Sequence, residues 1–148
     1  MHKVVLDSTV LVSAFLARTG VSAELLHKAK DGGFDICIAE EILEEVQRAL
    51  LQYQKIRKRY HYSDQTVIQF VQNLRIVAHL ITGLPSIEVV NSDPNDNMVV
   101  ACALKARAVY IVTRDNDLLS LENYEDIKVV TPEKFMGILR SGKYKPSF

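Results

Sequence analysis

Several short apolar runs in this chain lead into acidic residues, and this arrangement constrains the fold more than any other feature. The run at residues 3–6 leads directly into Asp7, and three later runs lead into further carboxylates. Short runs rich in β-branched residues are typical of strands buried in a parallel sheet. Ligands of open α/β sheets bind outside the carboxyl ends of the strands. The sequence therefore predicts a parallel sheet with carboxylates gathered along one edge.

The apolar runs alternate with segments of helical periodicity, which is typical of an α/β fold with a mostly parallel sheet. We expect five strands, at residues 3–6, 34–38, 87–90, 109–113 and 127–130. We expect helices near residues 8–16, 21–30, 41–51, 64–79 or 64–81, 97–106 and 118–121, and a last helix after Thr131. No repeat or interdomain linker interrupts this pattern, so residues 1–148 are expected to form a single domain.

The charge balance gives no global signature of nucleic-acid binding. The 148 residues contain 18 Lys and Arg against 18 Asp and Glu, so any contact with RNA must be local. A neutral chain has little colloidal repulsion, which permits self-association. Cys37 and Cys102 lack the spacing of a zinc site and are expected to be buried thiols. No apolar run has membrane length, so we expect a soluble cytoplasmic protein without membrane contact.

Aspartates occur at three of the predicted edge positions. Asp7 follows the first strand, Asp96 begins an unusually apolar helix, and Asp115 follows Thr113 at the end of another strand, with Asp117 two residues further on. Each of them, taken alone, could simply cap a helix. Together they would repel one another, so such a cluster requires compensating positive charge. Hard oxygen ligands of this kind favour Mg²⁺ or Mn²⁺.

One glutamate of the helix expected at residues 41–51 should also face this edge. Glu45 borders the apolar face of that helix, and Glu41, which shares a face with it, is the rival. Ser8 follows the first aspartate, and Asp93 lies in the turn before Asp96. Both positions suit residues that cap the start of a helix.

The segment 53–62 is the only dense basic stretch, and it is a candidate RNA-binding surface. Its cations could bind phosphates and its tyrosines could stack on bases. The residues concerned are Lys55, Arg57, Lys58, Arg59, Tyr60 and Tyr62. An exposed connection between two helices would account for the same residues. Other cations that could hold RNA instead are Arg114, Arg140, Lys143 and Lys145.

Two common classes of enzyme do not fit the sequence. No Gly-rich phosphate loop is present, which argues against a nucleotide hydrolase or a dinucleotide enzyme. The four histidines are scattered, and none is paired with a plausible Ser or Cys nucleophile. Phosphodiester cleavage needs neither feature, because carboxylates that hold one or two metal ions can activate water and neutralise the phosphate.

Three segments of the chain resemble the motifs of the PIN domain family. They are residues 4–14, 92–103 and 110–119, which contain Asp7, Asp96 and Asp115 respectively. Their order and spacing fit the whole chain. They resemble in particular the branch of the family that contains toxins of toxin–antitoxin systems, related to VapC-type ribonucleases.

The resemblance implies a three-layer α/β/α sandwich around a five-stranded parallel sheet. It implies a Mg²⁺- or Mn²⁺-dependent ribonuclease that cleaves single-stranded RNA, forms a homodimer and has an antitoxin as a possible partner. The acids of the family fall on Asp7, Glu45, Asp96 and Asp115. The implied metal ligands are Asp7, Asp96, Asp115 and Asp117, with Thr113, Ser8 and Asp93 in support.

One position departs from the family pattern and keeps alternatives open. The family usually has Asn two residues after its first Asp, where this chain has Thr9. A non-catalytic PIN scaffold that binds RNA or protein is therefore one alternative. A phosphohydrolase of the haloacid-dehalogenase type is another, since it also places Asp after the first strand. Such enzymes usually need a second Asp at the position of Thr9.

Overall fold

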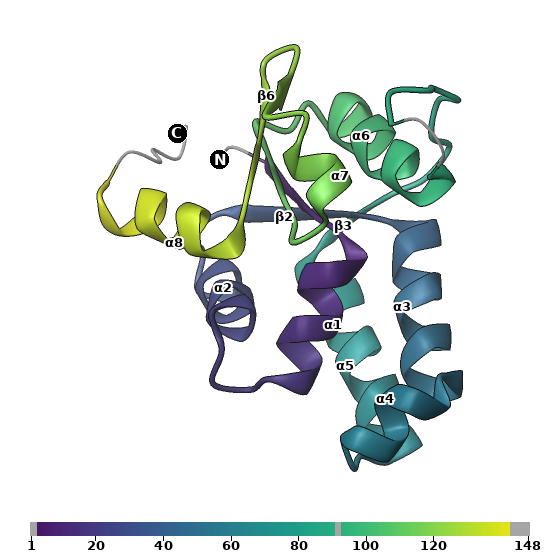
Figure 1. Ribbon diagram of the computed structural model, residues 1–148. Helices are drawn as coiled ribbons and strands as arrows, with labels where there is room; N and C mark the ends of the chain where they lie inside the picture. The colour runs from purple at the N-terminus through teal and green to yellow at the C-terminus, as the bar shows by residue number, and fades with distance from the viewer. Residues whose placement is uncertain (1–2, 91–92, 143–148) are drawn as a thin grey trace.

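The computed structural model describes residues 3–90 and 93–142, whose strands form one six-stranded sheet (Figure 1). The strands are β1 (Lys3–Leu6), β2 (Asp35–Ala39), β3 (His79–Ile81), β4 (Tyr110–Val112), β5 (Asn123–Tyr124) and β6 (Ile127–Val130). Their order across the sheet is β3-β2-β1-β4-β6-β5. All neighbouring pairs are parallel except β5 with β6. The predicted five-stranded parallel sheet is confirmed, and a two-residue antiparallel strand extends it at one edge.

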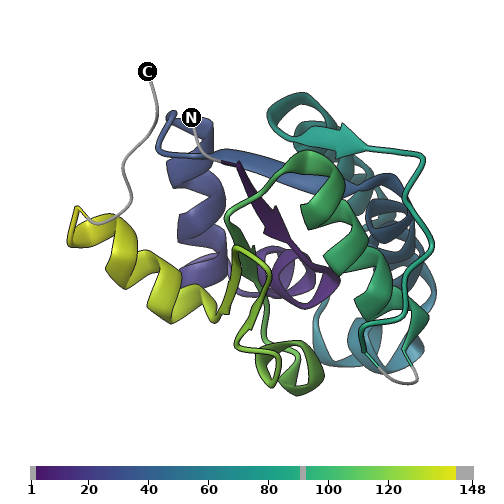
Figure 2. The same ribbon diagram turned by 90° about the horizontal axis from the view of Figure 1, so that it is seen from above.

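Helices cover both faces of this sheet. They are α1 (Ser8–Leu16), α2 (Val21–Lys30), α3 (Glu40–Gln52), α4 (Gln54–Arg59), α5 (Asp64–Val77), α6 (Pro94–Ala106), α7 (Asn116–Leu119) and α8 (Pro132–Arg140). Helix α6 packs across β1 and β2 on one face, and α1, α2 and α8 lie on the other (Figures 1 and 2). The residues of α6 from Val99 to Ala103 are all buried, as its apolar sequence predicts. The layered α/β/α arrangement is therefore confirmed.

The expectation of a strand at residues 87–90 is wrong. The third strand is β3, which follows α5 almost directly and pairs with β2 through Cys37 and His79. In the segment that we expected to be a strand, the backbone N–H groups of Val89 and Val90 donate to Oδ1 of Asn97, at 2.9 and 2.8 Å. The side chain of Asn97 therefore accepts hydrogen bonds from N–H groups that, in a strand, would donate to a neighbouring strand.

Three boundaries also differ from expectation. Helix α5 ends at Val77 because Ala78 is already extended, with φ −92° and ψ 155°, so the chain enters β3 where we expected continued helix. Helix α6 begins at Pro94, three residues earlier than expected, which puts Asp96 in its first turn. Part of the basic stretch forms the six-residue helix α4. Ser92, Lys143 and Lys145 lie outside the described residues.

Both cysteines are free and buried, as expected. Within the described ranges, no single helix has the length and apolar character needed to cross a membrane. By length and composition alone, α1 and α2 would pass only as a pair bent by 99°.

Candidate metal centre

The register of the two central strands brings Asp7 and Thr113 together. Leu6 of β1 lies opposite Val112 of β4, so the next residue of each strand emerges at the same edge. The Thr113 hydroxyl donates a hydrogen bond to Oδ2 of Asp7 and accepts one from the backbone N–H of Asp115 at 2.9 Å. Thr113 is fully buried, so this contact fixes the carboxylate of Asp7 against the sheet.

The other oxygen of Asp7 is also held by hydrogen bonds. The Thr9 hydroxyl donates to Oδ1 at 2.6 Å, and the backbone N–H of Val10 donates at 3.2 Å. Only 2% of Asp7 is exposed. Burial raises the pKa of this carboxyl, while the bonds from Thr113, Thr9 and Val10 oppose the increase. Asp7 therefore caps α1 and is oriented at the edge of the sheet at the same time.

Thr9 has a second contact that ties it to the loop after β4. Its hydroxyl oxygen accepts a hydrogen bond from the backbone N–H of Arg114 at 3.0 Å. The side chain of Thr9 therefore links Asp7 on β1 to the loop that carries Asp115. Threonine is short, but here it is long enough to reach both groups.

Two helix starts bring further aspartates to this edge. Asp93 caps α6 by accepting a hydrogen bond from the backbone N–H of Asn95 at 2.9 Å. Asp115 caps α7 by accepting from the N–H groups of Asp117 and Leu118, at 2.8 and 3.3 Å. Both aspartates therefore have the capping role that either would have in isolation. Capping alone does not explain their placement, because the starts of α6 and α7 bring the two carboxylates close to each other.

The carboxylates of Asp93, Asp96 and Asp115 form one cluster. One oxygen from each lies within 4.8 Å of the other two. Asp96 is 5% exposed, and its Oδ2 atom has no hydrogen-bond partner within the described part of the chain. Burial raises the pKa of Asp96 to about 7, and the negative charges of Asp115, Asp93 and Asp7 add to this increase. A buried, unpaired carboxylate oxygen among other carboxylates is costly unless a cation binds there.

The chemistry of this cluster fits a hard divalent cation. All of its ligand atoms are carboxylate oxygens, which suit Mg²⁺ or Mn²⁺. We expected Asp93 only in support, but its carboxylate lies within the cluster. Asp7 lies outside this group of three, although its charge reaches Asp96. Asp117 is exposed on α7, and Ser8 is the half-buried first residue of α1.

Glu45 adjoins the cluster through Asn95. The side-chain amide of Asn95 donates a hydrogen bond to Oε1 of Glu45 at 2.9 Å. Glu45 is half-buried, and burial raises its pKa, with the charge of Asp93 adding to the increase and Arg48 opposing it. Glu41 is exposed. The structure therefore turns Glu45 toward the acidic edge, as its place beside the apolar face of the helix predicts.

Sequence reasoning did not single out Asn95. The amide of Asn95 contacts a residue fifty positions earlier in the chain. The only signal in the sequence was a polar residue between two aspartates in a turn, which fits many residues without a functional role.

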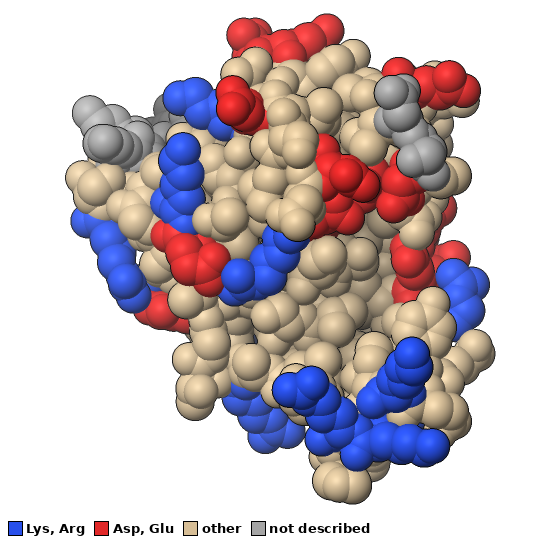
Figure 3. Space-filling view, viewed as in Figure 1, with Lys and Arg blue, Asp and Glu red and all other residues tan. Residues whose placement is uncertain are grey.

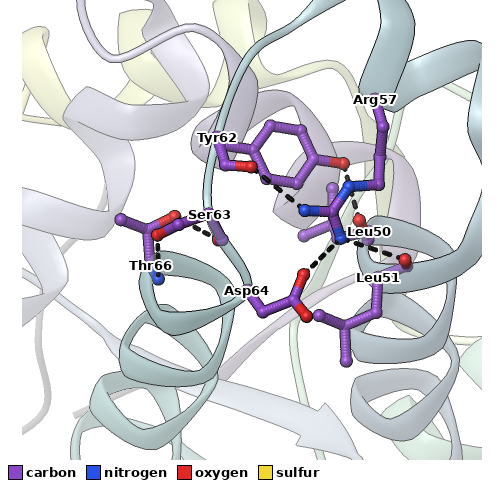
Figure 4. Close-up of polar contacts among 7 residues, drawn as sticks. All are labelled: Leu50, Leu51, Arg57, Tyr62, Ser63, Asp64 and Thr66. Atoms are coloured by element: carbon purple, nitrogen blue, oxygen red, sulfur yellow. Dashed lines mark hydrogen bonds and ion pairs between the residues drawn. The ribbon is translucent and has the colours of Figure 1, made fainter.

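The basic stretch lies apart from the acidic side chains on the face drawn in Figure 3. Figure 3 shows acidic side chains in the middle of the face drawn and basic ones gathered below them, over α4. Lys55, Lys58 and Arg59 are exposed. Arg57 is different, because it donates to the carbonyl oxygens of Leu51 and Tyr62 and to Asp64 (Figure 4).

Arg57 therefore has a structural role, and its assignment to an RNA-binding surface stays a prediction. Its guanidinium lies 4.9 Å from the centre of the Tyr62 ring, and it pairs with Asp64 at 2.6 Å. These contacts join the end of α3 to the start of α5 across α4. Two of the other cations that we considered also form ion pairs: Arg114 with Glu133, and Arg140 with Glu24.

Comparison with known proteins identifies this type of domain. A family model described as PIN domain matches residues 3–117. The solved structure of PAE2754 from Pyrobaculum aerophilum is similar, with a TM-score of 0.65 and 15% identity over 95% of this chain and 90% of that one. VapBC2 from Rickettsia felis, solved with a DNA fragment from its promoter, contains a chain with a TM-score of 0.58 and 14% identity. That match covers 86% of this chain and 97% of the other. No curated protein matches the sequence.

Proposed function

The chain belongs to the PIN domain family, and from this premise we propose that it is a ribonuclease that cleaves single-stranded RNA with a divalent cation. The observation that carries the proposal is the cluster of Asp93, Asp96 and Asp115, with the unpaired Oδ2 atom of Asp96 inside it. These three carboxylates would hold Mg²⁺ or Mn²⁺, with Asp7 beside them. When bound, such an ion neutralises charge on the phosphate and lowers the pKa of water.

The residues around the cluster have distinct tasks in this proposal. Thr113 and Thr9 hold the carboxylate of Asp7 in one orientation, so that it adds negative charge at a fixed place. Asn95 holds Glu45 beside the cluster. Glu45 is the candidate base: its raised pKa makes it a better proton acceptor than an ordinary glutamate, and it would take the proton of the attacking water. Asp117 is exposed, so it would contribute a metal ligand from the solvent side of the site.

Two observations bear on the alternatives. Thr9 makes the contacts to Asp7 and to the loop after β4 that keep the site assembled, which favours an active enzyme over a non-catalytic scaffold. Membership of the PIN family argues against a phosphohydrolase of the haloacid-dehalogenase type.

The biological role that we propose is that of the toxin in a toxin–antitoxin pair. The similarity to a chain of the VapBC2 complex supports it, and it implies a protein partner encoded with the enzyme. We propose further that the active form is a cytoplasmic homodimer built from one domain per chain, residues 1–148. The absence of net charge does not oppose such an association.

The direct test is cleavage of single-stranded RNA with and without Mn²⁺. The parent protein should cleave only when Mn²⁺ is present, and Asp115→Asn should lower the rate by at least roughly a hundredfold. Asparagine keeps the Oδ1 acceptor that caps α7, so the fold should persist. Asp126→Asn is a matched control, since Asp126 is exposed, lies in the turn between β5 and β6 and is not part of the cluster. Cleavage by Asp115→Asn at the parent rate would refute the proposed site.

A second prediction distinguishes the two glutamates of α3. Glu45→Gln should weaken Mn²⁺ binding by roughly tenfold or more, the usual effect of removing a carboxylate beside a metal site. Glu41→Gln should leave the Kd unchanged, because Glu41 points into solvent. Calorimetric titration with Mn²⁺ measures both values. A larger effect from Glu41→Gln would mean that the acidic edge lies on the other side of the helix.

A further inference from the structure

A small hollow lies at the carboxyl end of α1, at the opposite end of that helix from Asp7. It has a volume of about 290 Å³ and is lined by residues from two segments, 15–18 and 59–62, among them Arg18, Arg59, Tyr60 and His61. Phe15 and Tyr62 also line it, and their rings pack edge-on with centroids 5.0 Å apart. The lining of the hollow thus combines aromatic rings with two positively charged side chains.

The two arginines of this hollow are available to a ligand. Among residues 3–90 and 93–142, neither Arg18 nor Arg59 takes part in an ion pair, and both are exposed. The guanidinium of Arg59 lies 5.7 Å from the centre of the Tyr60 ring, and that tyrosine is 37% exposed. The nearby acid, Asp64, is already paired with Arg57. The local field at the hollow is therefore positive.

Guanidinium groups beside exposed aromatic rings are the usual means of holding single-stranded nucleic acid. Arginine binds the phosphates, and bases stack on tyrosine or on the guanidinium plane. The place of the hollow also fits a strand that reaches the acidic cluster. The nine residues of α1 extend for about 13 Å along the helix axis, and the basic and acidic patches lie on the same face of the molecule (Figure 3).

The acidic cluster alone would repel RNA. Its carboxylates carry like charge to the phosphates, and the nearest arginine in the sequence, Arg114, is held by both oxygens of Glu133 at 3.0 and 2.7 Å. A polyanion therefore needs a positive contact away from the bond that is cleaved. We propose that the hollow between Arg18 and Arg59 is an anchoring subsite that binds one nucleotide of single-stranded RNA, distant from the cleaved phosphodiester. This inference rests on the proposed ribonuclease function.

The test measures RNA binding in the inactive Asp115→Asn protein, by fluorescence polarisation across a series of salt concentrations. The RNA is roughly 12 nucleotides long, within the range of known single-strand site sizes. Changing both arginines, Arg18→Ala and Arg59→Ala, should lower the affinity by about tenfold or more. It should also reduce the salt slope by about 1.4, at about 0.7 for each phosphate contact. Tyr60→Ala should lower the affinity at least about fivefold by removing a stacking partner.

Two controls separate anchoring from a general effect on charge or fold. Lys128→Ala removes an exposed cation from β6, away from the hollow, and should leave the RNA affinity unchanged. Thermal melts of the double variant and the parent should coincide, because both arginines are exposed and neither takes part in an ion pair within residues 3–90 and 93–142.

The outcomes distinguish this inference from the function on which it rests. Unchanged affinity and salt slope in the double variant, with tight binding by the parent, would overturn the subsite and leave the ribonuclease proposal standing. No binding of any RNA by the parent would overturn the ribonuclease proposal as well.

Discussion

The Asp96→Asn protein is expected to lose Mn²⁺ binding and RNA cleavage, and yet to be more stable than the parent in the absence of metal. Asp96 is 5% exposed and faces the carboxylates of Asp93 and Asp115. Asparagine removes the negative charge but supplies an N–H₂ group that can donate to those neighbours. The substitution therefore removes repulsion from the metal-free fold while it removes a ligand from the site.

The same substitution should change how stability depends on pH. The pKa of Asp96 is about 7 in the folded protein, against an ordinary value of 3.8, so the folded state holds this proton more tightly than the unfolded state. The contribution of Asp96 to stability is therefore fully present below pH 3.8 and is lost as the pH rises through about 7. We expect the loss in the metal-free parent to be on the order of 2 kcal/mol.

Urea denaturation at pH 5 and pH 8, in the presence of a chelator, measures this effect. The parent should lose more stability between the two pH values than Asp96→Asn does. Some loss should remain in the variant, because burial also raises the pKa of Asp7 and of Glu45. In samples without chelator, added Mn²⁺ should restore the stability of the parent at pH 8 and leave the stability of the variant unchanged. Identical pH dependence in the two proteins would show that Asp96 does not titrate in this range.

Arg57→Ala should destabilise the fold by roughly 2–3 kcal/mol, with no effect on Mn²⁺ affinity. The substitution removes charge-assisted hydrogen bonds to the carbonyl oxygens of Leu51 and Tyr62 and an ion pair with Asp64. Bonds of this type to a charged group contribute about 1.5–3 kcal/mol each, and partial exposure reduces this value. For a chain of this length, the expected fall in Tm is roughly 4–10 °C.

Arg59→Ala is the matched comparison for this prediction. It removes the same side chain from the same short helix, but Arg59 is exposed, its guanidinium lies over the ring of Tyr60, and it takes part in no ion pair within residues 3–90 and 93–142. Its Tm should remain within about a degree of the parent, since isolated surface substitutions change stability little. Equal melting temperatures for the two variants would mean that the contacts of Arg57 do not join α3 to α5.

The parallel core of the fold could be predicted from the sequence because strand and edge signals coincide there. A buried run that ends in Asp7 and another that ends in Thr113 imply neighbouring strand ends, and the register of β1 and β4 confirms it. The third strand could not be predicted in the same way. Residues 87–90 are as apolar as a strand, but Asn97 takes their N–H groups. Which segment pairs with β2 is decided by tertiary contacts that periodicity does not record.

The candidate site could also be predicted only in part from the sequence. The aspartates could be found because each follows an apolar run or begins a buried helix, and these are local signals. The choice of Glu45 over Glu41 followed from the apolar face of α3, although its role in metal binding stays a prediction. The bridge from Asn95 to Glu45 spans fifty residues and has no local signal. The structural contacts of Arg57 could not be predicted, because a basic run has the same sequence pattern whether its side chains face solvent or join neighbouring helices.

The two outermost strands bear on how copies of this chain could associate. At one side of the sheet β3 has three residues, and at the other β5 has two. Beyond β3, the ammonium group of Lys105 binds the carbonyl oxygens of Thr82 and Gly83, so these acceptors are not offered to a second chain. Edge strands this short are poor templates for pairing with a strand of another chain. If two copies assemble, we expect them to meet through surfaces other than the sheet edges, so that each copy keeps a sheet of its own.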